Sequence, residues 1–282
     1  MNEQHNQIRD QQRQTWDEFS PGWQKWDDLV LGWLAPVGEE LLRNARLNHD
    51  SHLLDVAAGT GEPGLTAAAI VKNGKVTITD LSEGMLRVAA ENATRRGVTN
   101  LYTRQCEAGS MPFDDDSFDA VTCRFGFMFF PDIHLGLKEM MRVAKPGARI
   151  CAAVWGAPAK NAWATTVMST ITEHVDLPAP PPGAPGLFRC AAAGYMVDAY
   201  QQAGLNNVVE TEIEGELVFH TPEQYWSFMT EVAAPVVSGL AKADEATREK
   251  IQGIVLERAQ QSMKDGKVRL RWSATTVSGE KN

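Results

Sequence analysis

A short apolar run that leads straight into three glycines is the feature that most constrains this fold. Ser51 to Val56 has the composition of a buried strand, and Leu65 to Val71 has that of a helix. Between them lie Gly59, Gly61 and Gly64. Glycine is required where the backbone approaches a ligand closely, because any Cβ would intrude there. The order strand, glycine turn, helix therefore predicts a unit that holds a ligand against its backbone.

Strand-like and helix-like segments alternate through the rest of the first half. Further strands are predicted at Lys75 to Asp80, Leu101 to Cys106, Phe118 to Arg124 and Ala148 to Val154, and helices at Ser82 to Gly97 and Asp132 to Val143. Strands separated by helices imply right-handed crossovers and a parallel sheet covered on both faces. Two more strands, at Asn207 to Ile213 and Val268 to Val277, bring the predicted α/β sheet to seven.

Long segments that do not fit this alternation of strands and helices predict additional structure beside the sheet. We divide the chain into an N-terminal helical cap (1–46), a core (47–156), a lid insertion (157–206) and C-terminal strands (207–282) with a helical lid at 222–263. Pro178 to Gly186 is proline-rich and predicts an extended loop within the first lid. Near the N-terminus, apolar residues recur at spacings of three and four with a break around Pro21 and Gly22, which predicts packing onto the body; they are Trp16, Phe19, Trp23, Trp26, Val30 and Trp33.

Acidic residues follow three of the predicted strands and suggest a nucleoside ligand. Asp80 lies 21 positions after Gly59, the spacing expected in a dinucleotide fingerprint, so an NAD(P)-binding oxidoreductase is one interpretation. Asp55, four residues before Gly59, can orient the turn and attract an ammonium group, whereas it would repel a pyrophosphate. Glu107 follows the third strand, from where its carboxylate can accept a hydrogen bond from an adenine amino group.

These motifs resemble the class I S-adenosylmethionine-dependent methyltransferases, in the ubiquinone/menaquinone-type subgroup of small-molecule enzymes. The resemblance extends from about Trp16 to Gly156. It implies a doubly wound, Rossmann-like, mostly parallel sheet of seven strands with an antiparallel C-terminal strand and helical lid insertions. It also implies S-adenosylmethionine as cofactor, S-adenosylhomocysteine as product, and methyl transfer to a small, largely apolar metabolite at oxygen, carbon or sulfur.

The resemblance also implies the residues that bind the cofactor. Asp55, Ala57, Gly59 and Gly61 would surround its methionine part, and Asp80 would bind both ribose hydroxyls. The other implied contacts are Leu81, Met85, Glu107 and Ala108 at the adenine, Arg124 and Phe125 at the methionine end, and Trp16 and Trp23 as a cover. Glu107-Ala108 and Met111 stand where the family usually has Asp-Ala and Leu.

The acceptor pocket is predicted after the fourth and fifth strands, where aromatic residues gather. We expect Met128, Phe129, Phe130 and Trp155 to line it. Phe129 and Phe130 occupy the place where many relatives carry a histidine pair. Oxygen acceptors usually need a general base, and His134, Tyr195 and His220 are the candidate catalytic residues.

Composition limits the other classes of partner. Twenty-seven basic and 36 acidic residues give a net charge of −9, which repels nucleic acid and anionic membrane surfaces. The N-terminal ten residues are polar rather than signal-like, so we expect a cytoplasmic protein. The four cysteines form no C-x-x-C pair, and His49 and His52 lack cysteine or acidic company, so we expect reduced thiols and no metal site.

Two alternatives stay open from the sequence. The first is the NAD(P)-binding oxidoreductase. The second is a protein that binds S-adenosylmethionine without transferring its methyl group, which the missing histidine pair would permit. The acceptor, the acceptor atom and the oligomeric state have no motif that identifies them.

Overall fold

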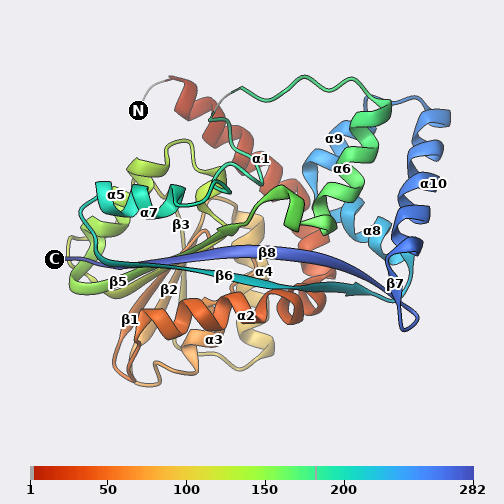
Figure 1. Cartoon of the computed structure of the whole chain (residues 1–282). Helices are drawn as coiled ribbons and strands as arrows, with labels where there is room; N and C mark the ends of the chain where they lie inside the picture. Colours follow the sequence, from red (N-terminus) through yellow and green to blue (C-terminus); the bar gives the residue numbers. More distant parts are fainter. Residues whose placement is uncertain (1–2, 182) are drawn as a thin grey trace.

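A computed structural model describes residues 3–181 and 183–282 of the chain (Figure 1). Its centre is one sheet in the order β3-β2-β1-β4-β5-β8-β6, with a short β7 paired to β8. The strands are β1 (His52–Val56), β2 (Lys75–Asp80), β3 (Leu101–Gln105), β4 (Phe118–Arg124), β5 (Ala144–Trp155), β6 (Asn206–Phe219), β7 (Met263–Lys264) and β8 (Lys267–Glu280). The first five are mutually parallel, and β8 runs antiparallel to both β5 and β6. The predicted Rossmann-like fold is confirmed.

Helices cover both faces of the sheet, as the buried strands require. They are α1 (Glu3–Lys25), α2 (Asp27–Ala45), α3 (Gly64–Ala68), α4 (Glu83–Arg95), α5 (Ile133–Val143), α6 (Ala162–His174), α7 (Tyr195–Gln202), α8 (Pro222–Val232), α9 (Ala234–Leu240) and α10 (Glu245–Gln261), with short turns η1 (Phe127–Phe129) and η2 (Pro158–Lys160). In Figure 1, α2 and α3 lie below the sheet, and α5 and α7 lie above it. Within the described residues, none of the helices combines the length and apolarity needed to cross a membrane.

Local signals placed several boundaries correctly. β2 and β4 have the predicted ends, and Ser82 caps α4 by accepting a hydrogen bond from the Met85 amide at 3.0 Å. Gly97 closes that helix with φ of +67°. Asp132 caps α5 in the same way as Ser82 caps α4, through the Leu135 amide. Each of these capping interactions involves residues no more than four positions apart, so the boundary could be predicted without any tertiary contact.

Three boundaries differ from the predictions because tertiary contacts decide them. β5 begins at Ala144, so the predicted stop at residues 145–147 is part of the strand. β6 continues six residues beyond Ile213, because it pairs with β8 over its whole length. α1 runs through Pro21 and ends at Lys25, and Gly22 lets it approach α8, since a Cβ there would lie 1.9 Å from the Glu231 carbonyl oxygen.

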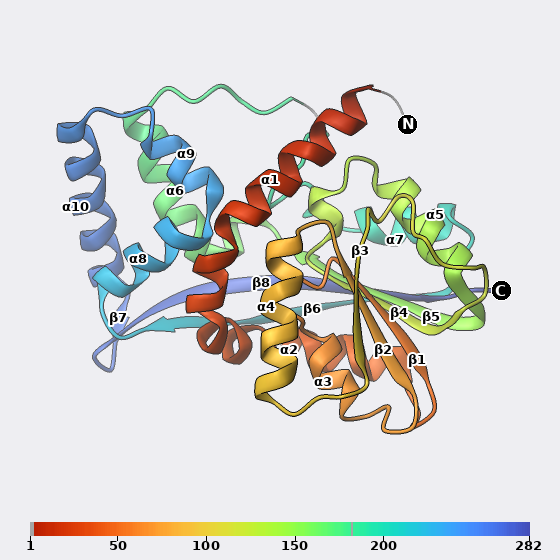
Figure 2. The ribbon, with the colours of Figure 1, turned by 180° about the vertical axis from the view of Figure 1, so that it is seen from behind.

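The helices predicted for the lid segments lie beside the sheet, and α1 passes next to them. Figures 1 and 2 show α6, α8, α9 and α10 grouped over the far part of the β6–β8 ribbon, with α1 passing between this group and the sheet. Residues 178–181 and 183–186, in the predicted extended stretch, have no helix or strand, and Pro182 lies outside the described residues, as do Met1 and Asn2. The division into four segments stays a prediction.

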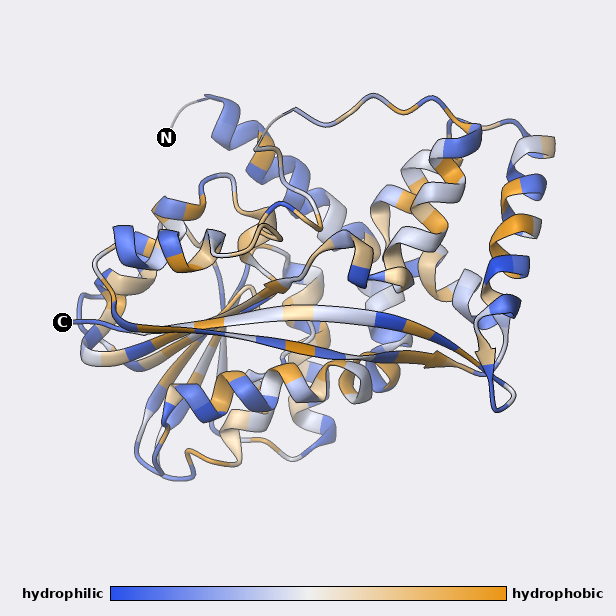
Figure 3. Ribbon diagram, in the orientation of Figure 1, coloured by the Kyte–Doolittle hydropathy of each residue, from blue (hydrophilic) through white to orange (hydrophobic). Residues whose placement is uncertain are grey.

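Apolar residues follow the strands, whereas the first half of α1 is hydrophilic (Figure 3). The core joins the sheet to the helical group through a cluster of aromatic rings around Trp33. This indole stacks on Trp155 at 5.4 Å between centroids and meets Trp163 edge-on at 4.8 Å. Phe228 of α8 lies 6.1 Å away. The four cysteines are free, and three of them are buried.

The ring cluster generates a prediction for stability. Replacing Trp33 with Ala should lower the free energy of unfolding by roughly 3–5 kcal/mol, because a buried ring that joins three elements leaves a cavity. Urea unfolding followed by circular dichroism measures this change. Tyr102→Ala is the control, since Tyr102 is 57% exposed, and it should change stability by less than about 0.5 kcal/mol. Equal effects of the two substitutions would contradict the importance of the cluster.

Candidate functional site

A cavity of about 1090 Å³ opens at the carboxyl ends of the parallel strands, beneath α1 and beside the helical group. Its size is at the upper end of the roughly 300–1,000 Å³ that small-molecule sites span. One part of the wall comes from the loops after β1, β2, β3 and β4, and the opposite part from α6, α8, α9 and residues 180–181 and 183–189. The predicted site residues can be placed relative to this cavity.

The glycines of the first turn have two separate roles. Gly59 lines the cavity with φ of +56°, and no atom lies within 4 Å of the position that a Cβ would take. Gly61 has φ of +111°, and a Cβ there would lie 2.7 Å from Leu65 and 3.2 Å from Ala89. It is therefore needed for packing beneath the turn rather than for lining the cavity. Ala57 lines the cavity in a left-handed conformation, with φ of +55°.

Asp55 is placed differently from the predicted cofactor contact. Its side chain is fully buried and does not line the cavity. One carboxylate oxygen accepts a hydrogen bond from the Gly64 amide at 3.0 Å, and the other accepts one from the Thr122 hydroxyl at 2.7 Å. Burial raises the pKa of Asp55 to about 7. Asp55 thus holds the turn from below, and the predicted attraction of an ammonium group would have to act through the turn.

Asp80 restrains the other side of the same turn and faces the cavity. Its two oxygens accept hydrogen bonds from the Gly59 and Ser82 amides, both at 2.9 Å. Burial raises the pKa of this carboxyl group, although the two amides oppose that shift. Leu81 and Met85 line the cavity beside it, as the sequence predicted for an adenine site.

Glu107 and Ala108 line the same end of the cavity, and α1 supplies a partner that sequence reasoning missed. The Arg9 guanidinium lies 3.6 Å from the Glu107 carboxylate. The two residues are 98 positions apart, so no local pattern could have paired them. His5, also on α1, lines the cavity as well.

The same helix brings the two predicted tryptophans over the cavity. Trp16 and Trp23 both line it, and Trp16 meets Phe129 edge-on at 5.1 Å. The helix is tied to the core by Asp17, whose carboxylate accepts hydrogen bonds from the Ser82 hydroxyl at 2.6 Å and the Gly84 amide at 3.0 Å. Both tryptophans therefore lie at the cavity, and their role as a cover over the cofactor stays a prediction.

Arg124 and Phe125 lie where β4 ends and have contrasting surroundings. Phe125 stacks on Trp155 with 4.2 Å between centroids, and both rings line the cavity. Arg124 also lines it, yet among the described residues no hydrogen bond or ion pair to its guanidinium is found. Burial lowers the pKa of Arg124, and the nearby carboxylates of Glu62 and Asp55 oppose that shift.

The predicted acceptor pocket is mostly apolar. Phe129 and Phe130 line it as predicted, but Met128 does not, because its side chain is fully buried and its sulfur accepts a hydrogen bond from the Trp155 amide. Further walls were not predicted, because they come from helices that the fold brings over the strand ends. They are Trp163, Ala164, Met168, Phe228, Met229, Val232, Ala233, Ala234, Pro235 and Val236.

The three candidate catalytic residues fall in different places. Tyr195, at the start of α7, lines the cavity. His134 and His220 are exposed and lie outside it, so the cavity does not include these two candidates. His134 faces solvent in the first turn of α5, and His220 follows the end of β6, where its amide binds Gln224.

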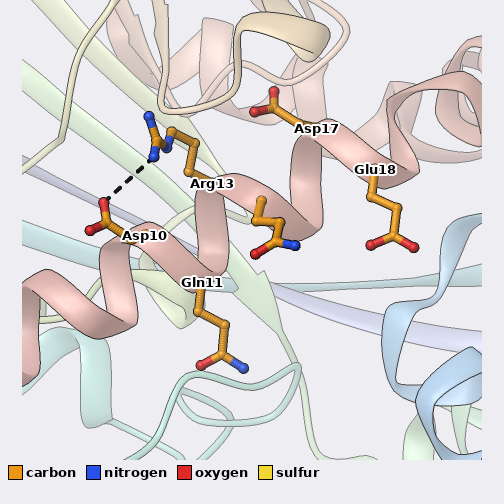
Figure 4. A pocket seen from close by; sticks show the side chains of 6 residues that line it. Asp10, Gln11, Arg13, Asp17 and Glu18 are labelled. Atoms are coloured by element: carbon orange, nitrogen blue, oxygen red, sulfur yellow. Dashed lines mark ion pairs between the residues drawn. The ribbon is translucent and has the colours of Figure 1, made fainter.

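A second hollow runs along the outer side of α1 (Figure 4). All of its lining residues come from that one helix, and they are Asp10, Gln11, Arg13, Gln14, Asp17 and Glu18. An ion pair joins Arg13 to Asp10 at 3.9 Å. Because no other element contributes a wall, this hollow is the surface relief of a charged helix rather than a built site.

The buried Asp55 carboxyl group generates a pH prediction. Its pKa of about 7 lies above the unfolded value near 3.9, so the folded state binds the extra proton between these values. The contribution of Asp55 to the free energy of unfolding is therefore largest below about pH 4. It falls by on the order of 4 kcal/mol as the pH rises to about 7. Urea unfolding across this range should show the fall in the wild type relative to Asp55→Asn. Parallel pH profiles of the two proteins would contradict the prediction.

Comparison with known proteins agrees with the fold and with the strand-end motifs. Residues 39–165 match the ubiE/COQ5 methyltransferase family. A ubiquinone/menaquinone biosynthesis C-methyltransferase of Brucella canis is 38% identical over 126 residues, which are 44% of each chain. The present chain thus spans less than half the length of the curated relatives that it matches.

Solved structures resemble a larger part of the chain. The YcgJ protein of Bacillus subtilis has a TM-score of 0.57 at 19% identity, covering 87% of this chain and 97% of its own. A phosphoethanolamine N-methyltransferase of Haemonchus contortus, solved with S-adenosylhomocysteine, has a TM-score of 0.53 at 16% identity, covering 87% and 52%. At such identities these structures support the fold alone. The match over residues 39–165 agrees with the resemblance to class I S-adenosylmethionine-dependent methyltransferases that the sequence shows.

Proposed function

We propose that this chain transfers a methyl group from S-adenosylmethionine to a small, largely apolar acceptor. The observation that carries the proposal is the single cavity wall on which Gly59, Asp80 and Glu107, from three successive strand ends, lie together. An open backbone and two carboxylates on one wall suit a nucleoside, which offers hydroxyl and amino donors. The family match over residues 39–165 supports the same cofactor.

The residues present fit this cofactor. The open space at Gly59 is a cradle that any Cβ would fill. We assign Asp80 to the two ribose hydroxyls and Glu107 to the adenine amino group, with Leu81 and Met85 against the base. Arg124, a cavity cation with no hydrogen bond or ion pair to its guanidinium among the described residues, suits the carboxylate of the methionine part.

For methyl transfer, the protein mainly has to align the acceptor with the methyl group and exclude water. When bound, S-adenosylmethionine supplies a methyl group on a positively charged sulfur. Phe125 and Trp155 present stacked aromatic surfaces on the cavity wall, and aromatic faces attract cations. Trp16 and Phe129 close the same region from α1 and η1, which keeps water away from the acceptor. Tyr195 is the candidate that lines the cavity and could hold an acceptor oxygen.

The finer assignments follow from composition. We keep the cytoplasm as the expected location. We assign the acceptor to small molecules rather than nucleic acid, because the net charge of −9 disfavours a phosphate backbone. The apolar helical walls suit a metabolite with little charge over most of its surface.

Calorimetric titration with S-adenosylmethionine and, separately, with NAD tests the cofactor. We expect binding of the first and none of the second. Asp80→Ala should weaken binding of S-adenosylmethionine by about 1–3 kcal/mol, because a charged acceptor for two hydroxyls is lost. Asp119→Ala is the matched control, since Asp119 lies at the opposite end of β4, paired with Lys145. Heat of binding with NAD alone would refute the proposal.

A panel of phenols, quinols and thiols tests whether binding leads to transfer. Formation of S-adenosylhomocysteine with any of them supports the methyltransferase. Cofactor binding with complete absence of transfer would favour a binding protein without activity.

Arg124 permits a second test of how the cofactor lies. Arg124→Met should weaken binding of S-adenosylhomocysteine about tenfold or more, because a charge-assisted hydrogen bond to its carboxylate is lost. Binding of 5′-methylthioadenosine, which lacks the amino-acid group, should change by less than about twofold in the same variant. Calorimetry measures both ligands. Equal losses for the two would place Arg124 away from the methionine end.

A further inference from the structure

Arg189 also lines the cavity, together with Arg9 and Arg124, and it lies on the proposed acceptor side. It belongs to the segment of residues 186–189, which is fixed to the loop after β4 at two points. The Gly186 amide donates a hydrogen bond to the Met128 carbonyl oxygen at 3.1 Å, and the Arg189 guanidinium donates one to the Phe130 carbonyl oxygen. The guanidinium is thus held beside Phe129 and Phe130, on the wall where the acceptor must lie.

The acidic side chains of the cavity all have other partners. Glu62 pairs with Arg96, and Glu107 pairs with Arg9. Asp80 holds the Gly59 and Ser82 amides, and Asp132 caps α5. Over residues 3–181 and 183–282, no carboxylate lies within ion-pair distance of Arg189. Its charge is therefore left without a protein counterion.

Holding the Arg189 charge among apolar groups costs free energy unless a ligand supplies an opposite charge. Arginine has five N–H donors, and within the described part of the chain the one side-chain hydrogen bond of Arg189 goes to the Phe130 carbonyl oxygen. The neighbouring cavity walls are apolar, formed by rings and aliphatic groups of α6, α8 and α9. A half-buried guanidinium in such a chamber favours an anionic oxygen, which it can bind through two parallel hydrogen bonds.

We propose that the acceptor is an apolar molecule carrying one anionic oxygen group, a carboxylate or an ionised phenol or enol, and that Arg189 binds this group. This inference rests on the proposed methyl transfer and adds the class of acceptor. Arg189 would fix which end of the acceptor turns toward the methyl group. Tyr195, which also lines the cavity, can donate a further hydrogen bond to the same oxygen.

Matched probes test the inference on the complex with S-adenosylhomocysteine. The probes are 4-butylbenzoate, its neutral counterpart 4-butylbenzamide, and 4-butyl-2-nitrophenolate, with dissociation constants measured by calorimetry. The wild type should bind at least one anionic probe about tenfold or more tightly than the benzamide. Preference for the benzoate or for the phenolate distinguishes the two kinds of anion. Equal binding of all three probes would overturn the inference.

Two substitutions separate ligand binding from a structural role of Arg189. Arg189→Gln keeps a donor for the Phe130 carbonyl but removes the charge, whereas Arg189→Lys keeps both. If Arg189 binds the anion, Gln should reduce the preference to about twofold or less and Lys should retain most of it. If it only fixes the segment, the preference survives in Arg189→Gln, and the inference is wrong.

Two controls complete the experiment. Arg104→Gln removes an exposed arginine of β3 outside the cavity and should leave the preference unchanged. Affinity for S-adenosylhomocysteine, measured in every variant, reports on folding. A wild type that fails to bind S-adenosylhomocysteine contradicts the proposed function, whereas one that binds it without preferring anions contradicts only the role of Arg189.

Discussion

Two buried carboxylates hold the turn between β1 and α3, and the cavity wall depends on that restraint. Asp55 binds the Gly64 amide from beneath, and Asp80 binds the Gly59 amide from the adjacent strand end. A turn with three left-handed residues, Ala57 among them, is strained without such partners. Hydrogen bonds from amide and hydroxyl donors offset the free-energy cost of burying both carboxylates. The turn is therefore held in a conformation that leaves its backbone open toward the cavity.

Closure of the cavity depends on α1, which joins the sheet to the helical group. Near its middle, Asp17 binds the first turn of α4, and at its end Lys25 and Trp26 bind Glu231 of α8. The family match ends at residue 165, whereas Arg189 and the walls from α8 and α9 lie beyond it. The cavity wall after β1 to β4 therefore lies within the matched range, and the opposite wall comes largely from residues beyond it.

Much of the cofactor side was predictable because its signals are local. Glycines and acids that follow strands must meet at one edge of a parallel sheet, so the positions of Gly59, Asp80 and Glu107 followed from the order of elements. The roles of Asp55 and Met128 did not, since direction of a side chain depends on which atoms pack around it. Arg9 and Arg189 were missed for a similar reason, because an arginine in a helix or loop carries no pattern that names its partner.

By itself the sequence determined the parallel core, the glycine turn and the capped helices, because these depend on periodicity and on hydrogen bonds within a few residues. Only the tertiary structure decided how far β6 extends, where α1 ends and which side chains reach the cavity. Strand length depends on a partner, since β6 pairs along all of β8. Exclusion of His134 and His220 from the cavity likewise depends on the packing of whole elements, which no short stretch of sequence encodes.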